Sequence, residues 1–388
     1  MRKSKRLKQI PPYLFVKIEE KKEELTKKGV DIIDFGIGDP DLPTPDHIFK
    51  KMHDVLETKA AANYPSSRGE ISFRKAVSNW YKERFNVSLD PKTEVCTLLG
   101  SKEGLAHLFF AFIDAGDISL VPDPAYPVYK IGTILAGGDP YILPLTAENN
   151  FIPDLDNIPA DILKRAKLLF INYPNNPTGA VAGKDFLEKC VNFAKANDLL
   201  IVSDLAYSEM AYGEYRPSSI LEIPGAKEVA IELHSLSKTY NMTGWRIGMA
   251  VGNKEAVQAL ATIKSNVDSG AFKAIQLAAI EALSGPQQCI AENNKIFEER
   301  RNVLVDGLNS LGWKLNKPKA TFYIWAPVPK DETSASFAEK LLEKCGILTV
   351  PGSGYGSFGE GYVRFAITIP KERIKEAIKR MKDANIHG

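Results

Sequence analysis

Between residues 90 and 270 the sequence alternates short β-prone apolar runs with segments of helical periodicity. Runs such as LLFIN (168–172) and VAIELHS (229–235) are apolar almost throughout, as expected of strands that are buried on both faces. Alternation at this spacing implies right-handed crossovers, so it predicts a mostly parallel sheet with helices on both faces. The expected strands are 95–99, 119–122, 141–145, 168–172, 200–204, 229–234 and 248–251.

The two ends of the chain lack this strict alternation. Residues 289–312 read as one long polar helix, and 322–326, 335–344 and 362–367 as an apolar run, a helix and a strand. A strand followed by a Gly/Pro/Asp-rich loop (31–45, DIIDFGIGDPDLPTP) is placed to bridge two domains. We therefore predict an α/β large domain over residues 48–288. A smaller α+β domain is expected from residues 1–47, which include an N-terminal arm, and 289–388.

Charge and composition exclude several classes of protein. The 50 Lys+Arg and 48 Asp+Glu give a formal net charge of +2, so no nucleic-acid partner is expected. The longest strongly apolar stretch, 105–113, is far shorter than the ~20 residues that span a bilayer. The four Cys and five His show no ligand spacing, which favours a reducing cytoplasm and no metal site. Pro11 and Pro12 interrupt the place where a signal peptide needs its apolar core.

Reactive side chains follow three of the expected strands at their carboxyl ends. Asn176 follows 168–172, Asp204 closes the next strand with Tyr207 three residues on, and Lys238 and Arg246 follow 229–234. In open parallel sheets, ligands bind beyond the carboxyl ends of the strands. An amide, a carboxylate, a phenol, an amine and a guanidinium meeting there are the equipment of Schiff-base chemistry with pyridoxal phosphate.

Each part of that cofactor calls for a different group. Its aldehyde needs a neutral amine, so the pKa of the lysine must fall from ~10.4, which nearby cations and desolvation achieve. Its ring nitrogen stays protonated if a buried carboxylate faces it. Its phosphate needs hydroxyls, a guanidinium and the N–H groups of a helix N-terminus. Residues 100–104 (GSKEG), between the first expected strand and its helix, have the composition for that phosphate site.

Two motifs, PNNPTG (174–179) and SLSKTYNMTGWRIG (235–248), resemble those of the fold-type I pyridoxal-phosphate aminotransferases of class I/II. The likeness runs over nearly the whole chain. Within that family the chain is most similar to the LL-diaminopimelate aminotransferase group and its aspartate-aminotransferase-like neighbours. PPYLF (11–15), GSKEGLAH (100–107) and VPDPAYPVYKIGT (121–133) carry this finer likeness. It implies a ping-pong transfer of an amino group from an L-amino acid to a 2-oxo acid.

The resemblance also implies a role for each motif residue. Lys238 is expected to form the Schiff base and to move the proton, Asp204 to pair with the ring nitrogen, and Tyr207 to bind the cofactor's phenolic oxygen together with Asn176. The remaining cofactor contacts implied are Ser101, Lys102, Ser235 and Arg246 around the phosphate and Tyr126 on the ring.

Substrate and subunit contacts are implied in the same way. Arg364, in YVRFAI, is expected to clamp the substrate carboxylate, helped by the Gly38 backbone and Asn176. Tyr64 is expected to reach the phosphate of a partner subunit, so the family pattern implies a homodimer with sites at the interface. Lys102 and Arg68 are candidates for the distal end of the substrate. Tyr13 and Phe15 are candidates for the pocket entrance.

Other functions stay open at this point. Aspartate or alanine aminotransferases and C–S β-lyases share the motifs, and β-elimination starts from the same carbanion. A third candidate is an effector sensor of the same fold, which usually carries a fused DNA-binding domain for which the short N-terminal arm leaves no room. Residues 354–359 match G-x-G-x-x-G, but a strand follows instead of a helix. We therefore expect a flexible loop near the substrate entrance there, and no nicotinamide site.

Overall fold

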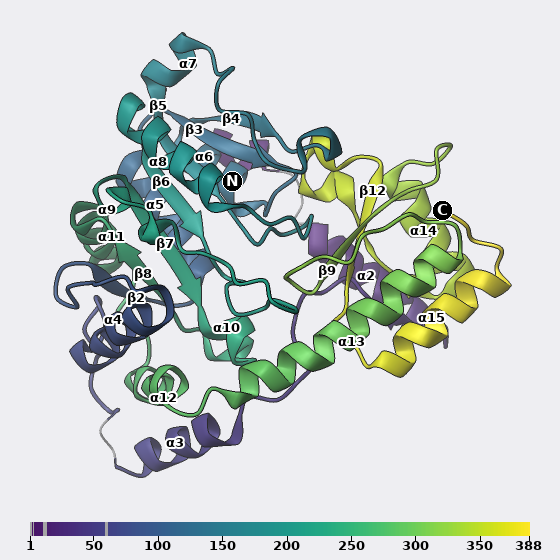
Figure 1. The fold of residues 1–388 in the computed structure, drawn as a ribbon, viewed down its shortest axis with the longest axis horizontal. Coiled ribbons are helices and arrows are strands. Elements are labelled where there is room, and N and C mark those ends of the chain that lie inside the picture. Colours follow the sequence, from purple (N-terminus) through teal and green to yellow (C-terminus); the bar gives the residue numbers. More distant parts are fainter. Residues whose placement is uncertain (1, 3, 11–13, 59–60) are drawn as a thin grey trace.

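The computed structural model describes residue 2 and residues 4–10, 14–58 and 61–388, and for residues 14–19 and 21 it describes the backbone alone. Figure 1 shows a larger body built around a sheet and a smaller body that carries the C-terminus. The long helix α13 (Gln288–Ser310) runs from one body to the other.

The sheet of the larger body has seven strands in the order β2-β8-β7-β6-β5-β3-β4. β8 is antiparallel to both its neighbours, and the other pairs are parallel. Every residue of β2, β3, β7 and β8 is buried, which explains their continuous apolar runs. The mostly parallel sheet predicted from the sequence is confirmed. The strands are β2 (Val95–Leu98), β3 (Ile118–Asp123), β4 (Asp139–Pro144), β5 (Ala166–Ile171), β6 (Leu200–Asp204), β7 (Ala230–Ser235) and β8 (Gly248–Gly252).

Helices cover both faces of this sheet. Neighbouring residues of β5 point into different hydrophobic cores: Leu168 joins the core under α5, α6 and α11, and Leu169 the core under α4, α8 and α12. The helices of this body are α3 (Asp46–Glu57), α4 (Ile71–Phe85), α5 (Ser101–Phe112), α6 (Val128–Ala136), α7 (Ala160–Arg165), α8 (Lys184–Asn197), α9 (Ala226–Val229), α10 (Leu236–Thr239), α11 (Lys254–Val267) and α12 (Lys273–Ser284).

The smaller body is an α+β unit with a separate core, as predicted. Its antiparallel sheet has the order β11-β12-β9, and β1 pairs with β10 in parallel. The strands are β1 (Ile33–Asp34), β9 (Tyr323–Pro327), β10 (Ile347–Leu348), β11 (Val350–Pro351) and β12 (Tyr362–Ala366). The helices are α2 (Leu14–Lys27), α13, α14 (Ser334–Cys345) and α15 (Lys371–Asp383). The domain limits at 47/48 and 288/289 stay a prediction.

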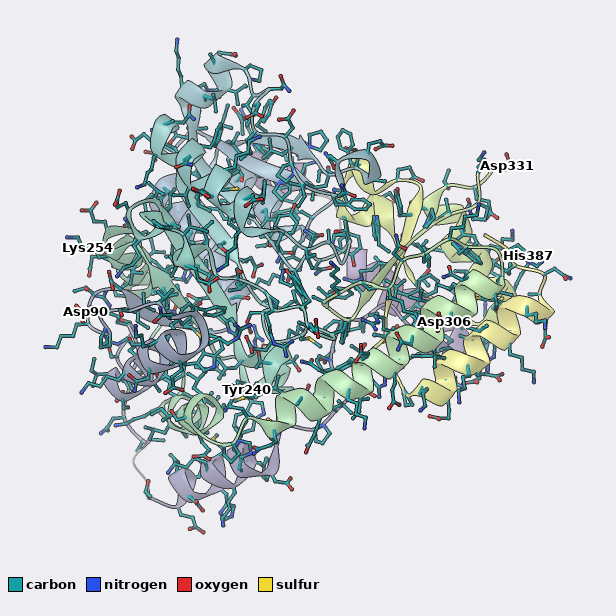
Figure 2. The ribbon with its side chains drawn as sticks, viewed as in Figure 1. Asp90, Tyr240, Lys254, Asp306, Asp331 and His387 are labelled. Atoms are coloured by element: carbon teal, nitrogen blue, oxygen red, sulfur yellow. The ribbon has the colours of Figure 1, made fainter. Side chains whose placement is uncertain are left out.

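The N-terminal arm includes α1 (Lys5–Gln9), which has no buried residue. It lies beside α6, and Arg6 Nη1 donates to the carbonyl of Leu135 (2.8 Å). Between α12 and α13, Gln287 Oε1 accepts a hydrogen bond (2.8 Å) from the hydroxyl of Tyr240, which is labelled in Figure 2. This contact lies just before α13 begins. Within the described residues, no helix has the length and apolar character that crossing a bilayer requires.

Candidate active site

A cavity of about 580 Å³ lies where the carboxyl ends of the large sheet meet the smaller body. The side chains at its walls come from the loops after β5, β6 and β7, from the start of α5, and from β9 and β12. The structure thus brings together the strand ends that the sequence singled out. The predicted site residues that line the cavity are Gly38, Ser101, Lys102, Tyr126, Asn176, Asp204, Tyr207, Ser235, Lys238, Arg246 and Arg364.

Asp204 is a buried carboxylate at the end of β6. Its Oδ2 accepts a hydrogen bond from the Tyr129 hydroxyl (2.7 Å), while its Oδ1 has no partner among the described residues. Burial raises the pKa of Asp204 to about 6, although the Tyr129 hydroxyl and the Ala206 N–H oppose the shift. A buried acceptor without a donor is costly, so Oδ1 is suited to a hydrogen-bond donor of a molecule bound in the cavity.

Lys238 lies in α10, directly after β7, at a helix start where the Ser235 hydroxyl accepts from the Ser237 N–H (3.2 Å). Its Nζ donates to the carbonyl of Gly38 (2.7 Å). Burial lowers the pKa of Lys238 to about 8; Asp39 opposes this shift, and Arg364 and Arg246 add to it. A lysine with this pKa is partly neutral near pH 7, so it is available as a nucleophile.

The N-terminus of α5 forms an anion site at one end of the cavity. Gly100 precedes the helix with a φ of 84°, and a Cβ there would lie 2.4 Å from Arg246 Nη2. Glycine therefore lets the guanidinium lie against the helix start, where Arg246 Nη2 also donates to the Leu99 carbonyl (3.1 Å). The N–H groups of the first helical turn, beside a guanidinium and the Ser101 and Ser235 side chains, favour a phosphate.

Arg364, from β12, is 2% exposed and forms the opposite wall. Its Nη1 donates to Asn176 Oδ1 (2.9 Å) and its Nη2 to the Gly36 carbonyl (2.7 Å). Its guanidinium lies 4.2 Å from the Tyr323 ring centroid and 5.0 Å from that of Tyr355. Nε is buried and has no partner within the described part of the chain, so the cation retains a donor for a carboxylate.

The comparisons with known proteins agree with this geometry. The family model described as aminotransferase class I and II matches residues 30–381. The chain belongs to this aminotransferase family. The family predicted from the motifs is therefore confirmed.

Relatives of the chain align over almost its whole length. It is 56% identical over 382 residues to an LL-diaminopimelate aminotransferase of Moorella thermoacetica, covering 98% of both chains. It is 53% identical over 383 residues to an LL-diaminopimelate aminotransferase of Aquifex aeolicus, covering 99% of both. The substrate-bound structure of BacF from Bacillus subtilis superposes with a TM-score of 0.96 at 37% identity, over 99% of this chain and 98% of that one. The predicted fold-type I architecture is thus confirmed as well.

Some residues singled out from the sequence do not reach the cavity. Tyr64 is 90% exposed and lies outside the cavity of its own chain, so its role in a partner subunit stays a prediction. Arg68 donates to Gln258 Oε1 (2.8 Å) and to the Thr93 carbonyl (2.9 Å), at a different surface depression. Tyr13 and the side chain of Phe15 lie outside the described residues.

The structure corrects the expectation of a flexible loop at residues 354–359. The buried carboxylate of Asp123 accepts hydrogen bonds from the N–H groups of Phe358 (2.9 Å) and Ser357 (3.1 Å). Tyr355, from the same loop, packs its ring against Arg364. The loop is therefore held by the larger body and supports a residue of this aminotransferase cavity. The strand β12 follows it, as expected, instead of the helix of a dinucleotide motif.

One cluster of potential metal ligands forms among the described residues, although the sequence predicted none. Glu103 and His107, both of α5, lie close to Asp268, which directly follows α11. The buried Lys264 already contributes a cation, with its Nζ 2.8 Å from Glu103 Oε1 and 3.1 Å from Asp268 Oδ2. Burial tends to lower the pKa of Lys264, but these two carboxylates raise it overall. The cluster is therefore an internal ion-pair network under the anion site.

Sequence reasoning missed several residues in and around the site, of which Tyr129, Tyr323 and Asp39 matter most to its chemistry. Tyr129 donates to Asp204, Tyr323 contacts both Tyr207 and Arg364, and Asp39 lines the cavity near Lys238. Tyr129 is the last residue of PDPAYPVY (122–129), and Tyr323 lies in ATFYIW (320–325). A tyrosine in an apolar run is usually a core residue, so neither stood out in the sequence. The partners of these tyrosines come from other elements, so no local pattern identified them.

Proposed function

We propose that this protein is an LL-diaminopimelate aminotransferase that uses pyridoxal 5′-phosphate and passes the amino group to 2-oxoglutarate by a ping-pong mechanism. The observation that carries the proposal is one cavity in which Asp204, Lys238 and Arg364 face the same space. The names of the relatives in Moorella thermoacetica and Aquifex aeolicus support the substrate. They also favour a place in lysine biosynthesis.

The cavity fits this cofactor group by group. The unpartnered Oδ1 of Asp204 matches the ring N–H, and the start of α5 with Arg246 matches the phosphate. Tyr126 would stack on the ring, and Tyr207 and Asn176 would hydrogen-bond its phenolic oxygen. When bound, pyridoxal phosphate supplies an electrophilic carbonyl and an electron sink. Lys238, with its lowered pKa, supplies the amine that holds it.

The remaining steps belong to the residues of the chain. Arg364 binds the substrate carboxylate through Nε and its remaining hydrogens, because Asn176 and Gly36 already fix the orientation of the guanidinium. Lys238, as a free amine, would hold the proton that leaves the substrate Cα and would give it back as the general acid. Lys102 is the candidate for the distal end of the substrate.

The proposal includes an assembly and a compartment. We propose a homodimer with its sites at the interface, in which Tyr64 completes the phosphate site of the partner subunit; its exposure on its own chain supports this role. The four cysteines are free, and three of them are buried, which favours a reducing cytoplasm.

The test compares the purified protein with two lysine variants. With added pyridoxal phosphate, the parent protein should give a visible absorbance band and a borohydride-trapped adduct at Lys238. Lys238→Ala should give neither and should lose turnover. Lys254→Ala, which changes an exposed lysine of α11, should behave like the parent protein. A parent protein without the band and the adduct would refute the cofactor assignment.

The substrate is tested separately. With 2-oxoglutarate as acceptor, LL-diaminopimelate should react faster than aspartate, alanine or aromatic amino acids. Inert LL-diaminopimelate with fast aspartate or alanine would refute the substrate and leave the family assignment intact. Pyruvate and ammonia released from cystathionine without any oxo acid would identify a β-lyase instead.

A further inference from the structure

Tyr323 is a buried residue that contacts both halves of the cavity. It begins β9 in the smaller body and is 3% exposed. Its hydroxyl lies 3.0 Å from that of Tyr207, which follows β6 of the larger body. Its ring lies under the guanidinium of Arg364, 4.2 Å from Cζ to the ring centroid. One side chain therefore touches a proposed cofactor ligand and the proposed carboxylate clamp.

Backbone pairing fixes the two phenols relative to each other. The chain after Tyr207 runs beside the chain before Tyr323: the N–H of Tyr212 donates to the Lys319 carbonyl (2.9 Å), and the N–H of Thr321 donates to the Met210 carbonyl (2.9 Å). Tyr207 also packs in the hydrophobic core of the smaller body, against the ring of Tyr323. These backbone hydrogen bonds hold the two segments together, and they therefore keep the two buried hydroxyls in contact.

The ring of Tyr323 is fixed just as firmly toward Arg364. In the β9–β12 pair Tyr323 lies opposite Ala366, two residues along the strand from Arg364 and therefore on the same face. A Cβ at position 38 would lie 2.2 Å from the Tyr323 hydroxyl oxygen, so only glycine fits beside it. The Tyr323 hydroxyl therefore lies directly against the Gly38 backbone.

We propose that Tyr323 is a positioning residue that couples the carboxylate clamp to the cofactor-binding phenol. Its ring holds the Arg364 guanidinium in place. Its hydroxyl donates to the oxygen of Tyr207, so that the hydrogen of Tyr207 points into the cavity, toward the phenolic oxygen of the cofactor. This inference rests on the proposed function, because it assigns a direction to a hydrogen bond with pyridoxal phosphate.

The chemistry of the pair lets both hydroxyls act as donors. Burial holds the pKa of both tyrosines above the usual value, so both keep their hydrogens at neutral pH. A phenol that accepts a hydrogen bond becomes a stronger donor through its own O–H. The charged groups that act on the pair are Arg364, Asp204 and Asp39, Lys238 of α10 faces the same cavity, and Tyr323→Phe leaves all of them in place.

The consequence is a shift that can be read in the spectrum of the loaded protein. When the bound chromophore loses its proton, negative charge concentrates on its phenolic oxygen, so a weaker donor at Tyr207 raises the pKa of the chromophore. Losing one hydrogen bond between phenols corresponds to a rise of about 0.5 to 1 unit. Tyr323→Phe keeps the ring under Arg364, so the KM for the amino donor should stay within about twofold.

The experiment titrates the visible absorbance of three variants loaded with pyridoxal phosphate. Tyr323→Phe should show the raised pKa with a nearly unchanged KM. Tyr323→Leu should show the same rise and, because the ring is lost, a KM raised at least about tenfold. Tyr362→Phe is the matched control, since this tyrosine of β12 stacks on Trp325 and lies outside the cavity, and it should titrate like the parent protein.

The outcomes separate this inference from the proposed function. A parent protein that forms no absorbing adduct refutes the proposed function. Adducts in the parent protein and in Tyr323→Phe that titrate at the same pH refute the coupling alone. If Tyr323→Leu does not fold, Tyr323→Phe still decides the hydroxyl part, because it retains the ring and its packing.

Discussion

Removal of the Tyr129 hydroxyl tests how the chain keeps a buried carboxylate ionised. This hydroxyl donates to Asp204 Oδ2 at 2.7 Å, while the Tyr129 ring stacks on Phe170 with centroids 5.1 Å apart. Tyr129→Phe preserves the stacking and removes only the donor. Asp204 then keeps the Ala206 N–H but no side-chain donor within the described residues.

The size of the effect follows from the charge of the acceptor. A hydrogen bond to a charged group contributes about 1.5–3 kcal/mol, and one pKa unit corresponds to ~1.4 kcal/mol. The pKa of Asp204 in the cofactor-free protein should therefore rise from about 6 by roughly 1 to 2 units. In the unfolded chain the pKa is ~3.9 in both proteins.

The sign of the pH dependence is fixed by these pKa values. A carboxyl group with a raised pKa in the folded state costs stability as the pH rises above its unfolded pKa, and the cost stops growing above its folded pKa. In the parent protein this growth ends near pH 6, and in Tyr129→Phe it continues to about pH 7–8. Relative to the parent protein, Tyr129→Phe should thus lose additional stability as the pH rises from about 6 to about 7–8. At higher pH this additional loss should stay at about 1.5–3 kcal/mol.

The assay is urea unfolding of the cofactor-free protein at pH 5.5 and 8.5, at one protein concentration. Tyr173→Phe is the control, because the Tyr173 hydroxyl donates to a neutral acceptor, the Phe151 carbonyl, at 2.6 Å. It should lower the free energy of unfolding by a similar amount at both pH values. An equal loss at both pH values for Tyr129→Phe would refute the view that Tyr129 stabilises the ionised form of Asp204.

Two further substitutions probe the cations of the site. Arg364→Lys should raise the KM for the amino donor about tenfold or more, because one ammonium cannot replace a planar fork of donors; steady-state kinetics with an unchanged KM would contradict the clamp. Lys264→Met should lower the free energy of unfolding by about 3–5 kcal/mol, because Glu103 and Asp268 lose their buried counter-cation. Urea unfolding measures this loss, and a loss below about 1 kcal/mol would show that the ion pairs contribute little.

The large sheet could be predicted from the sequence because its strands carry their own signal. The predicted strand 200–204 coincides with β6, and 95–99 differs from β2 by one residue. Both lie in the buried sheet, so most of their positions are apolar. The strand expected within 31–45 contains only two paired residues, Ile33 and Asp34, because its partner is β10, more than 300 residues further along the chain. Nothing local marks where such a pairing ends.

The residues of the candidate site also fall into a group that the sequence predicted and a group that it did not. Residues that follow strand ends, such as Asp204 and Lys238, were predicted because a parallel sheet collects its carboxyl ends at one edge. The residues that orient them were not. Tyr129 reaches Asp204 from α6, and Tyr323 reaches Tyr207 from the other body, so both contacts exist only in the assembled fold. The buried Lys264 was missed for the same reason, since an isolated lysine in a helix is normally solvated.

The loop after β1 contributes backbone carbonyls to the site. Its carbonyls hold one cation from each body: that of Gly36 accepts from Arg364 Nη2 (2.7 Å), and that of Gly38 accepts from Lys238 Nζ (2.7 Å). Two residues of backbone therefore help to set the distance between the carboxylate clamp and the reactive amine. A side chain at Gly38 would collide with the Tyr323 hydroxyl, so glycine is required where the backbone itself is the ligand. The glycine at position 38 is thus a consequence of the position of the loop between the two bodies.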